Sequence, residues 1–215
     1  NIAVLNALHF WVDGGSTSHI LSDYLGGYAI RNLTGGTPPS IASPLIAGIG
    51  NSGTVTAPSQ YVPIGKGFFI DATDSGTIVF KNSQRFFKLE SSSRPQNSEK
   101  NLEDENQYIR IGYEDPEGFH RQLLLGFLPN SSADENYNSG YDALQYMSRA
   151  DDLFFIIENN PSNRYAIQGV SRFSDTLEFP VGLIISESGS HHIMLDAVEN
   201  FNHTIYLKDN LLETT

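Results

Sequence analysis

Side chains that carry oxygen gather in one short segment of this 215-residue chain. Asp134, Glu135, Asn136 and Asp142 offer carboxylate and amide oxygens, the ligands that calcium prefers, close to Gly140. Their spacing is not that of an EF-hand loop, which requires a Glu at its twelfth position. The segment therefore predicts either a structural calcium site or, as is common in acidic proteins, a solvated loop stabilised by Asx turns. No other cofactor is predicted.

A second group consists of aromatic side chains that combine an apolar ring with a polar tip. Stacked on sugar rings, such side chains form the binding face of carbohydrate-binding proteins. Six aromatic residues could lie outside the core: Trp11, Tyr24, Tyr28, Tyr137, Tyr141 and Tyr146. The candidate carbohydrate ligands are Trp11, Tyr24, Tyr28, Tyr137 and Tyr141. The alternative is ordinary packing of these rings in the core and at the rim of a β-sandwich.

Catalytic signatures are weak. The chain has no Cys, which excludes thiolate nucleophiles and thiolate metal sites. His191 and His192 are adjacent and would point to opposite faces of a strand, so they cannot share a metal on one face. The glycine pattern at 48–53 is followed by β-branched residues and Pro58, which predicts a loop and not a phosphate-binding helix N-terminus. No catalytic residue is assigned, and a hydrolase that uses paired carboxylates such as Asp151 and Asp152 stays as the enzymatic alternative.

The charge of the chain bears on its partners. Thirteen Lys and Arg residues stand against 25 Asp and Glu residues, for a formal net charge of −12. Such a chain repels phosphate backbones and anionic lipids, so nucleic acid is not an expected partner. No apolar run approaches the roughly 20 residues of a membrane span, so no membrane insertion is expected. The chain opens on Asn1 within an alternating apolar stretch, which suggests a piece excised from a longer polypeptide.

The elements that must position these residues are predicted to be strands. Apolar and polar residues alternate in residues 8–13, which is typical of a half-buried strand. Residues 108–114 and 119–127 flank Asp115-Pro116-Glu117-Gly118, a sequence that favours a type I turn and therefore a hairpin. Further hairpins are predicted for 68–72 with 77–80 and for 153–158 with 164–170, and further strands near 181–186, 193–197 and 205–207. Only residues 141–148 could form a helical turn or two.

This rhythm predicts an all-β fold, a two-sheet antiparallel β-sandwich of jelly-roll type with long loops. We expect one domain over residues 1–215. In the alternative, residues 1–89 and 108–215 form two β subdomains joined by the polar segment 90–107.

Several phrases of the sequence resemble a known family. YVPIGKGFFI at 61–70 and GTIVFKNSQR at 76–85 are similar to a signature of large secreted proteins that use the type IX secretion system, just ahead of their C-terminal sorting domain. Similar phrases follow in the same order at 108–111, 140–143, 165–169, 179–182 and 205–210. Lys66 stands where the family usually has Gln. The resemblance covers nearly the whole chain, implies an extracellular or cell-surface β domain, and carries no catalytic residues.

Two functions are expected on this basis. The first is a non-catalytic surface or adhesion module of a larger secreted bacterial protein, with neighbouring domains of the same polypeptide as partners. The second is a carbohydrate-binding module attached to a polysaccharide-degrading enzyme, with a polysaccharide or a cell-surface glycan as partner.

Overall fold

The computed structural model describes residues 7–49, 51–87 and 105–215, and these residues form an almost entirely β structure. Three 3-10 helices are present in them: η1 (Leu21–Asp23), η2 (Ser43–Leu45) and η3 (Asn82–Gln84). The strands are β1 (Leu8–Asp13), β2 (Gly26–Arg31), β3 (Gly36–Thr37), β4 (Ile41–Ala42), β5 (Ala47–Ile49), β6 (Asn51–Ser52), β7 (Gln107–Glu114), β8 (Phe119–Phe127), β9 (Ala143–Leu144), β10 (Asp152–Phe155), β11 (Tyr165–Val170), β12 (Val181–Ile184) and β13 (His192–Glu199).

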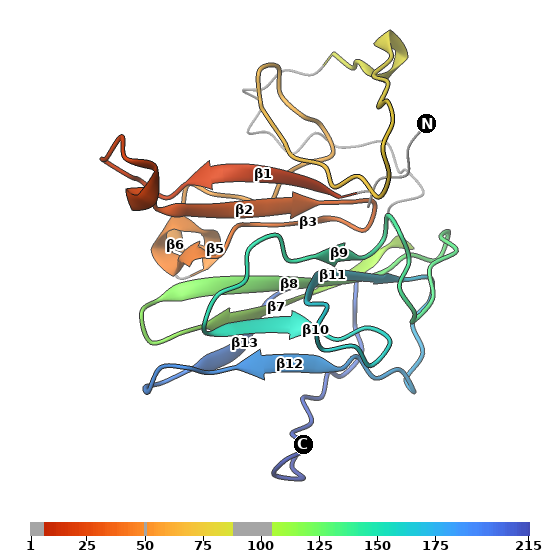
Figure 1. Ribbon diagram of the computed structural model, residues 1–215. Helices are drawn as coiled ribbons and strands as arrows, with labels where there is room; N and C mark the ends of the chain where they lie inside the picture. Colours follow the sequence, from red (N-terminus) through yellow and green to blue (C-terminus); the bar gives the residue numbers. More distant parts are fainter. Residues whose placement is uncertain (1–6, 50, 88–104) are drawn as a thin grey trace.

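Two main sheets build the fold. The smaller sheet has the order β1-β2-β3, and the larger has the order β12-β10-β11-β8-β7-β13, with β4 added to β8 and β9 added to β11. Figure 1 shows the β1–β3 sheet as a separate layer above the larger sheet. This arrangement confirms the predicted all-β sandwich. The strand pairs are antiparallel, as expected, except that β11 runs parallel to β8.

The hairpin of β7 and β8 is the longest local element and follows from its turn. The Gly118 N–H donates to the Asp115 carbonyl over 3.0 Å, and Asp115 Oδ1 accepts from the N–H groups of Glu117 and Phe119. Gly118 has φ of 82°, a left-handed conformation that glycine adopts without strain. The turn fixes the register, so Gln107 pairs with Phe127 at the open end and Glu114 with His120 near the turn.

The two layers meet through apolar side chains and through hydrogen bonds, among them those from Arg110 to the Gly36 carbonyl and from the Leu33 N–H to the Gly140 carbonyl. Leu124 of β8 is fully buried, and it approaches Gly35 so closely that a Cβ there would overlap its side chain. Thr34 Oγ1 donates to the Tyr141 carbonyl over 2.6 Å, in space that exists because residue 169 is glycine. Burial of one Leu side chain contributes roughly 1.5–3 kcal/mol, so Leu124 alone stabilises the contact between the layers measurably.

Aromatic rings fill the opposite face of the larger sheet. Phe127 contacts the rings of Phe173, Phe179 and Phe201, with centroid distances of 5.5, 5.9 and 5.5 Å. Phe127 meets Phe173 and Phe179 edge-on, and Phe173 meets Phe201 edge-on. Aromatic quadrupoles favour this geometry. The larger sheet is therefore packed on both faces at this end of β8, whereas every residue of the edge strands β12 and β13 stays at least partly exposed.

Local patterns did not predict every element. Residues 68–72 and 77–80 form no hairpin, because Phe69 instead pairs its backbone with His9 of β1. Residues 141–148 hold strand β9 and no helix, and residues 205–207 form no strand. Within the pattern at 48–53, residues 48–49 lie in strand β5 and residues 51–52 in strand β6, and residue 50 is outside the described residues.

The polar segment 90–107 falls largely on residues 88–104, outside the described part of the chain. On either side of it, the two halves of the chain share one sheet, because β4 pairs with β8 through Ile41 and His120. Within the described residues, no helix is long and apolar enough to cross a membrane.

Candidate functional site

Five side chains from four segments of the chain meet on the smaller sheet. We call them the aromatic cluster: His9, Trp11, Tyr28, Phe69 and Tyr146. His9 and Trp11 lie two residues apart on β1 and therefore on the same face of the strand. Tyr28 of β2 is the direct cross-strand partner of Trp11. Phe69 joins them through two backbone hydrogen bonds with His9, of 3.0 and 2.8 Å. Tyr146 comes from the segment that follows β9.

Tyr28 and Tyr146 are the centre of the aromatic cluster. Tyr28 meets Trp11, Tyr146 and Phe69 edge-on, with centroid distances of 5.2, 4.6 and 5.7 Å. Tyr146 stacks on His9 at 4.4 Å and lies 6.1 Å from Phe69. Phe69 is 50% exposed and Tyr146 39% exposed, whereas Trp11 and Tyr28 are partly buried. The cluster thus presents two accessible rings on a fixed aromatic base.

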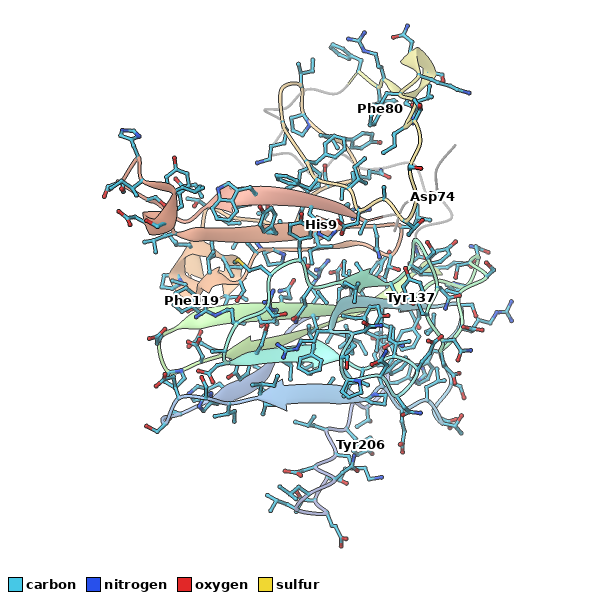
Figure 2. All side chains as sticks on the ribbon, in the orientation of Figure 1. His9, Asp74, Phe80, Phe119, Tyr137 and Tyr206 are labelled. Atoms are coloured by element: carbon cyan, nitrogen blue, oxygen red, sulfur yellow. The ribbon has the colours of Figure 1, made fainter. Side chains whose placement is uncertain are left out.

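Polar groups lie next to these rings. Lys66 Nζ donates to the Trp11 carbonyl over 3.2 Å, and His9 Nε2 lies 3.6 Å from the Asp71 carboxylate. His9 is 2% exposed, and this burial lowers its pKa from the usual value, although the negative charge of Asp71 opposes the shift. A neutral imidazole is therefore favoured beneath Tyr146. Figure 2 shows His9 on the smaller sheet.

A buried ion pair holds the segment that carries Tyr146. Arg121 of β8 binds Asp152 of β10 through two contacts, Nε to Oδ1 at 2.7 Å and Nη2 to Oδ2 at 3.0 Å. The same pair forms two hydrogen bonds with the segment that carries Tyr146. Arg121 Nη2 donates to the Met147 carbonyl, and the Arg149 N–H donates to Asp152 Oδ2. The position of Tyr146 therefore depends on residues of the larger sheet.

Of the four tyrosines and one tryptophan predicted to bind carbohydrate, the structure brings together Trp11 and Tyr28. Tyr24 is 41% exposed, at the end of η1 and outside the aromatic cluster. Tyr137 packs on Tyr165 at 5.8 Å, at the right-hand end of the larger sheet in Figure 2. Tyr141 is partly buried at the contact with Thr34.

Sequence reasoning did not include His9 or Phe69 among the ligand candidates. Half of the surface of Phe69 is exposed. The alternation of residues 8–13 does place His9 and Trp11 on one face. Nothing in the local sequence links them to residue 69 or residue 146.

The predicted calcium ligands lie in a loop whose oxygens already accept hydrogen bonds. Asp134 Oδ1 accepts from the Asn136 N–H at 2.9 Å and from Asn138 Nδ2 at 3.0 Å. Asp142 is 1% exposed, and its two oxygens accept from the N–H groups of Asn138 and Gly169. Glu135 and Asn136 are exposed. Among the described residues, no group of three or more His, Asp or Glu side chains is placed to hold a metal ion.

Burial also changes the protonation of Asp142. The pKa of Asp142 is raised to about 7, first by desolvation and also by the negative charges of Asp134 and Glu158, while the two backbone N–H donors oppose the shift. Near neutral pH the buried Asp142 carboxyl is therefore partly protonated, whereas its neighbours Asp134 and Glu158 carry the negative charge of this loop.

The paired carboxylates considered for hydrolysis are engaged with protein donors. Asp151 accepts the backbone N–H groups of Ser186 and Glu187, and Asp152 binds Arg121. Both carboxylates therefore make hydrogen bonds within the fold, Asp151 through Oδ1 and Asp152 through both oxygens.

A histidine and an aspartate do meet next to a cavity of about 230 Å³ that lies between residues 46–57 and strands β7, β8 and β13. His120 Nε2 lies 2.8 Å from Asp196 Oδ2, which also accepts from Gln122 Nε2 at 2.8 Å. Arg110 donates to Gln122 Oε1 and to Glu199. His120 is fully buried, and the network joins strands β7, β8 and β13 through side-chain hydrogen bonds.

Comparison with known proteins gives a family and no named relative. No curated protein and no solved structure matches the chain. A family model described as "Domain of unknown function (DUF8693)" matches residues 3–215, which is nearly the entire sequence. The chain therefore belongs to the DUF8693 family.

Proposed function

We propose that this chain is a non-catalytic binding module whose ligand is a carbohydrate, bound at the aromatic cluster. The observation that carries the proposal is the meeting of Trp11, Tyr28, Phe69 and Tyr146 in one half-exposed group, with Phe69 and Tyr146 accessible. Aromatic faces stack on the C–H faces of sugars, while nearby polar groups bind hydroxyls. The Asp71 carboxylate and the Lys66 ammonium group are the polar partners in this proposal.

Rigidity supports the proposal. Trp11 and Tyr28 sit on paired strands, Phe69 is attached to β1 by two backbone hydrogen bonds, and the segment with Tyr146 is held by the Arg121–Asp152 pair. A binding surface that is ordered before the ligand arrives loses little conformational entropy on binding. An extracellular location and a role in adhesion to surface glycans, in a larger secreted protein, belong to the same proposal and rest on the sequence resemblance.

The test is polysaccharide binding by affinity electrophoresis and by a glycan array, with Tyr146→Ala as the main variant. Tyr24→Ala is the matched control, because Tyr24 is 41% exposed and Tyr146 39% exposed, but only Tyr146 is in the aromatic cluster. Loss of one stacked ring should weaken binding about tenfold or somewhat less, since such a ring contributes roughly 0.5–1.5 kcal/mol beyond its buried area.

Phe69→Ala should behave like Tyr146→Ala. Parent protein that binds no glycan would overturn the proposal. Equal loss of affinity in Tyr24→Ala and Tyr146→Ala would also overturn it, because binding would then not depend on the aromatic cluster.

A further inference from the structure

A second cavity, of about 200 Å³, opens between the acidic loop and the segments that flank β10 and β12. Three exposed glutamates line it: Glu135, Glu158 and Glu178. The apolar side chains of Ile156 and Phe179 contribute another part of the lining. The Tyr137 N–H donates to Glu158 Oε1 over 3.2 Å, so the cavity lies beside Tyr137, which is labelled in Figure 2.

The most informative lining residue is Gln168 of β11. Its side chain is 2% exposed, and its Oε1 has no hydrogen-bond partner. A buried acceptor without a donor costs roughly 1–3 kcal/mol, and such groups are rare in native proteins. The unpaired amide oxygen of Gln168, at the lining of the cavity, therefore indicates a hydrogen-bond donor that a ligand would supply.

The electrostatics of this cavity favour a cation. Three carboxylates surround it within a chain of net charge −12. The pKa of nearby Asp142 is raised first by burial and then by the charges of Asp134 and Glu158. A positively charged group bound here would neutralise part of this repulsion.

Size and geometry narrow the class of cation. No group of three or more acidic or His side chains within the described residues is placed to hold one metal ion. The cavity is smaller than the roughly 300–1,000 Å³ of sites for drug-sized ligands, so it suits a group the size of one side chain. An alkylammonium group has several N–H donors at one end and an apolar stem at the other.

We propose that this cavity binds a primary ammonium group on a short alkyl stem, with one N–H donated to Gln168 Oε1 and the charge facing the glutamates. The stem would contact Ile156 and Phe179. A lysine side chain carries both the primary ammonium group and the alkyl stem, and an amino sugar carries the primary ammonium group on a ring carbon. The inference does not depend on carbohydrate binding at the aromatic cluster, which lies on the other sheet.

The first experiment titrates the full ¹⁵N-labelled chain with n-butylammonium chloride and follows the amide chemical shifts. Saturable shifts at the loop around Glu135, at Glu158, at Gln168 and at Glu178 are expected. Two probes serve as ligand controls. n-Butanol has the stem without the charge, and tetramethylammonium has the charge without an N–H donor, so both should bind at least about tenfold more weakly.

The variants separate the buried oxygen from the charge. Gln168→Met removes the amide oxygen and keeps the length of the side chain, and Glu178→Gln removes one charge at an exposed position that should not affect folding. Each should weaken n-butylammonium binding about tenfold. Asp175→Asn is the matched control, because Asp175 is exposed on the same segment and does not line the cavity, so its affinity should equal that of the parent.

Three results with these probes and variants would overturn the inference. They are equal binding of tetramethylammonium and n-butylammonium, unchanged affinity in both Gln168→Met and Glu178→Gln, and shifts of the same amides by calcium chloride in the absence of any response to n-butylammonium. Titrations with glucosamine and with Nα-acetyl-lysine then compare the two sources. Binding of either supports the inference, and failure of both overturns it.

Discussion

Replacement of Asp152 by Asn removes one charge from the buried ion pair that links β8 to β10. Asp152 is fully buried and Arg121 is 5% exposed, so the guanidinium group would stay buried without its counter-ion. Removal of one partner from a buried pair costs about 3–5 kcal/mol, largely because the other charge is left uncompensated. We expect Asp152→Asn to lower the free energy of unfolding by about this amount.

A surface pair in the same sheet provides the control. Arg110 Nε lies 2.9 Å from Glu199 Oε1, and the Glu199 side chain is 48% exposed. Exposed pairs contribute at most about 1 kcal/mol, so Glu199→Gln should change stability little. Urea denaturation, followed by tryptophan fluorescence, measures both variants, and equal slopes of the unfolding transition make the comparison valid.

A double variant, Arg121→Met with Asp152→Leu, distinguishes two causes of instability. One is the loss of the ion-pair attraction, and the other is the cost of a buried guanidinium group without a counter-ion. If the cost of Asp152→Asn comes from the unpaired guanidinium, the double variant should recover most of the lost stability. Asp152→Asn should also weaken glycan binding, because the ion pair holds the segment of Tyr146. A cost for Asp152→Asn no larger than that for Glu199→Gln would refute this reasoning.

Three further predictions concern the loop and the interface between the sheets. Because the folded-state pKa of Asp142 is raised from 3.8 to about 7, the folded state retains a proton that the unfolded state releases; stability should fall as pH rises from about 4 to 7. Asp142→Asn should reduce this slope in urea titrations at pH 5 and pH 8, and a slope equal to that of the parent would contradict it. Gly169→Ala should cost about 1–3 kcal/mol, because the new Cβ would overlap Thr34 Oγ1, and added Thr34→Ala should restore part of the loss in thermal melts. If the loop around Asp134 binds calcium with a Kd of about 10⁻⁴–10⁻³ M, calcium at roughly 10–100 times that Kd should stabilise the fold by about 1.4–2.7 kcal/mol relative to chelator. An unchanged melting midpoint would leave this loop as a solvated acidic turn.

Local sequence predicted those elements whose geometry is set by neighbouring residues. Asp115, Pro116 and Gly118 stand in the order that a type I turn requires, and the alternating strands on both sides then pair in one register. The alternation of residues 8–13 predicted β1 for the same reason. The all-β class follows because these short-range preferences agree along the chain.

The choice of distant partners depended on the tertiary structure. Val181–Ile184 and His192–Glu199 are close in sequence, yet β12 pairs with β10 and β13 with β7, at opposite edges of the larger sheet. The parallel pairing of β11 with β8 has no local signal either, because no turn joins these strands directly. Such pairings are decided by which apolar faces can be buried together, and many residues contribute to that balance.

The candidate sites follow the same division. The sequence alone determined that Trp11 and the tyrosines could bind a sugar and that residues 134–142 are acidic. Only the tertiary structure decided that Tyr146 stacks on His9, that Phe69 is exposed beside them, and that Gln168 is buried without a donor near the glutamates. Residue type fixes what chemistry a side chain can perform, but the packing of separate segments decides which side chains meet and how much water they retain.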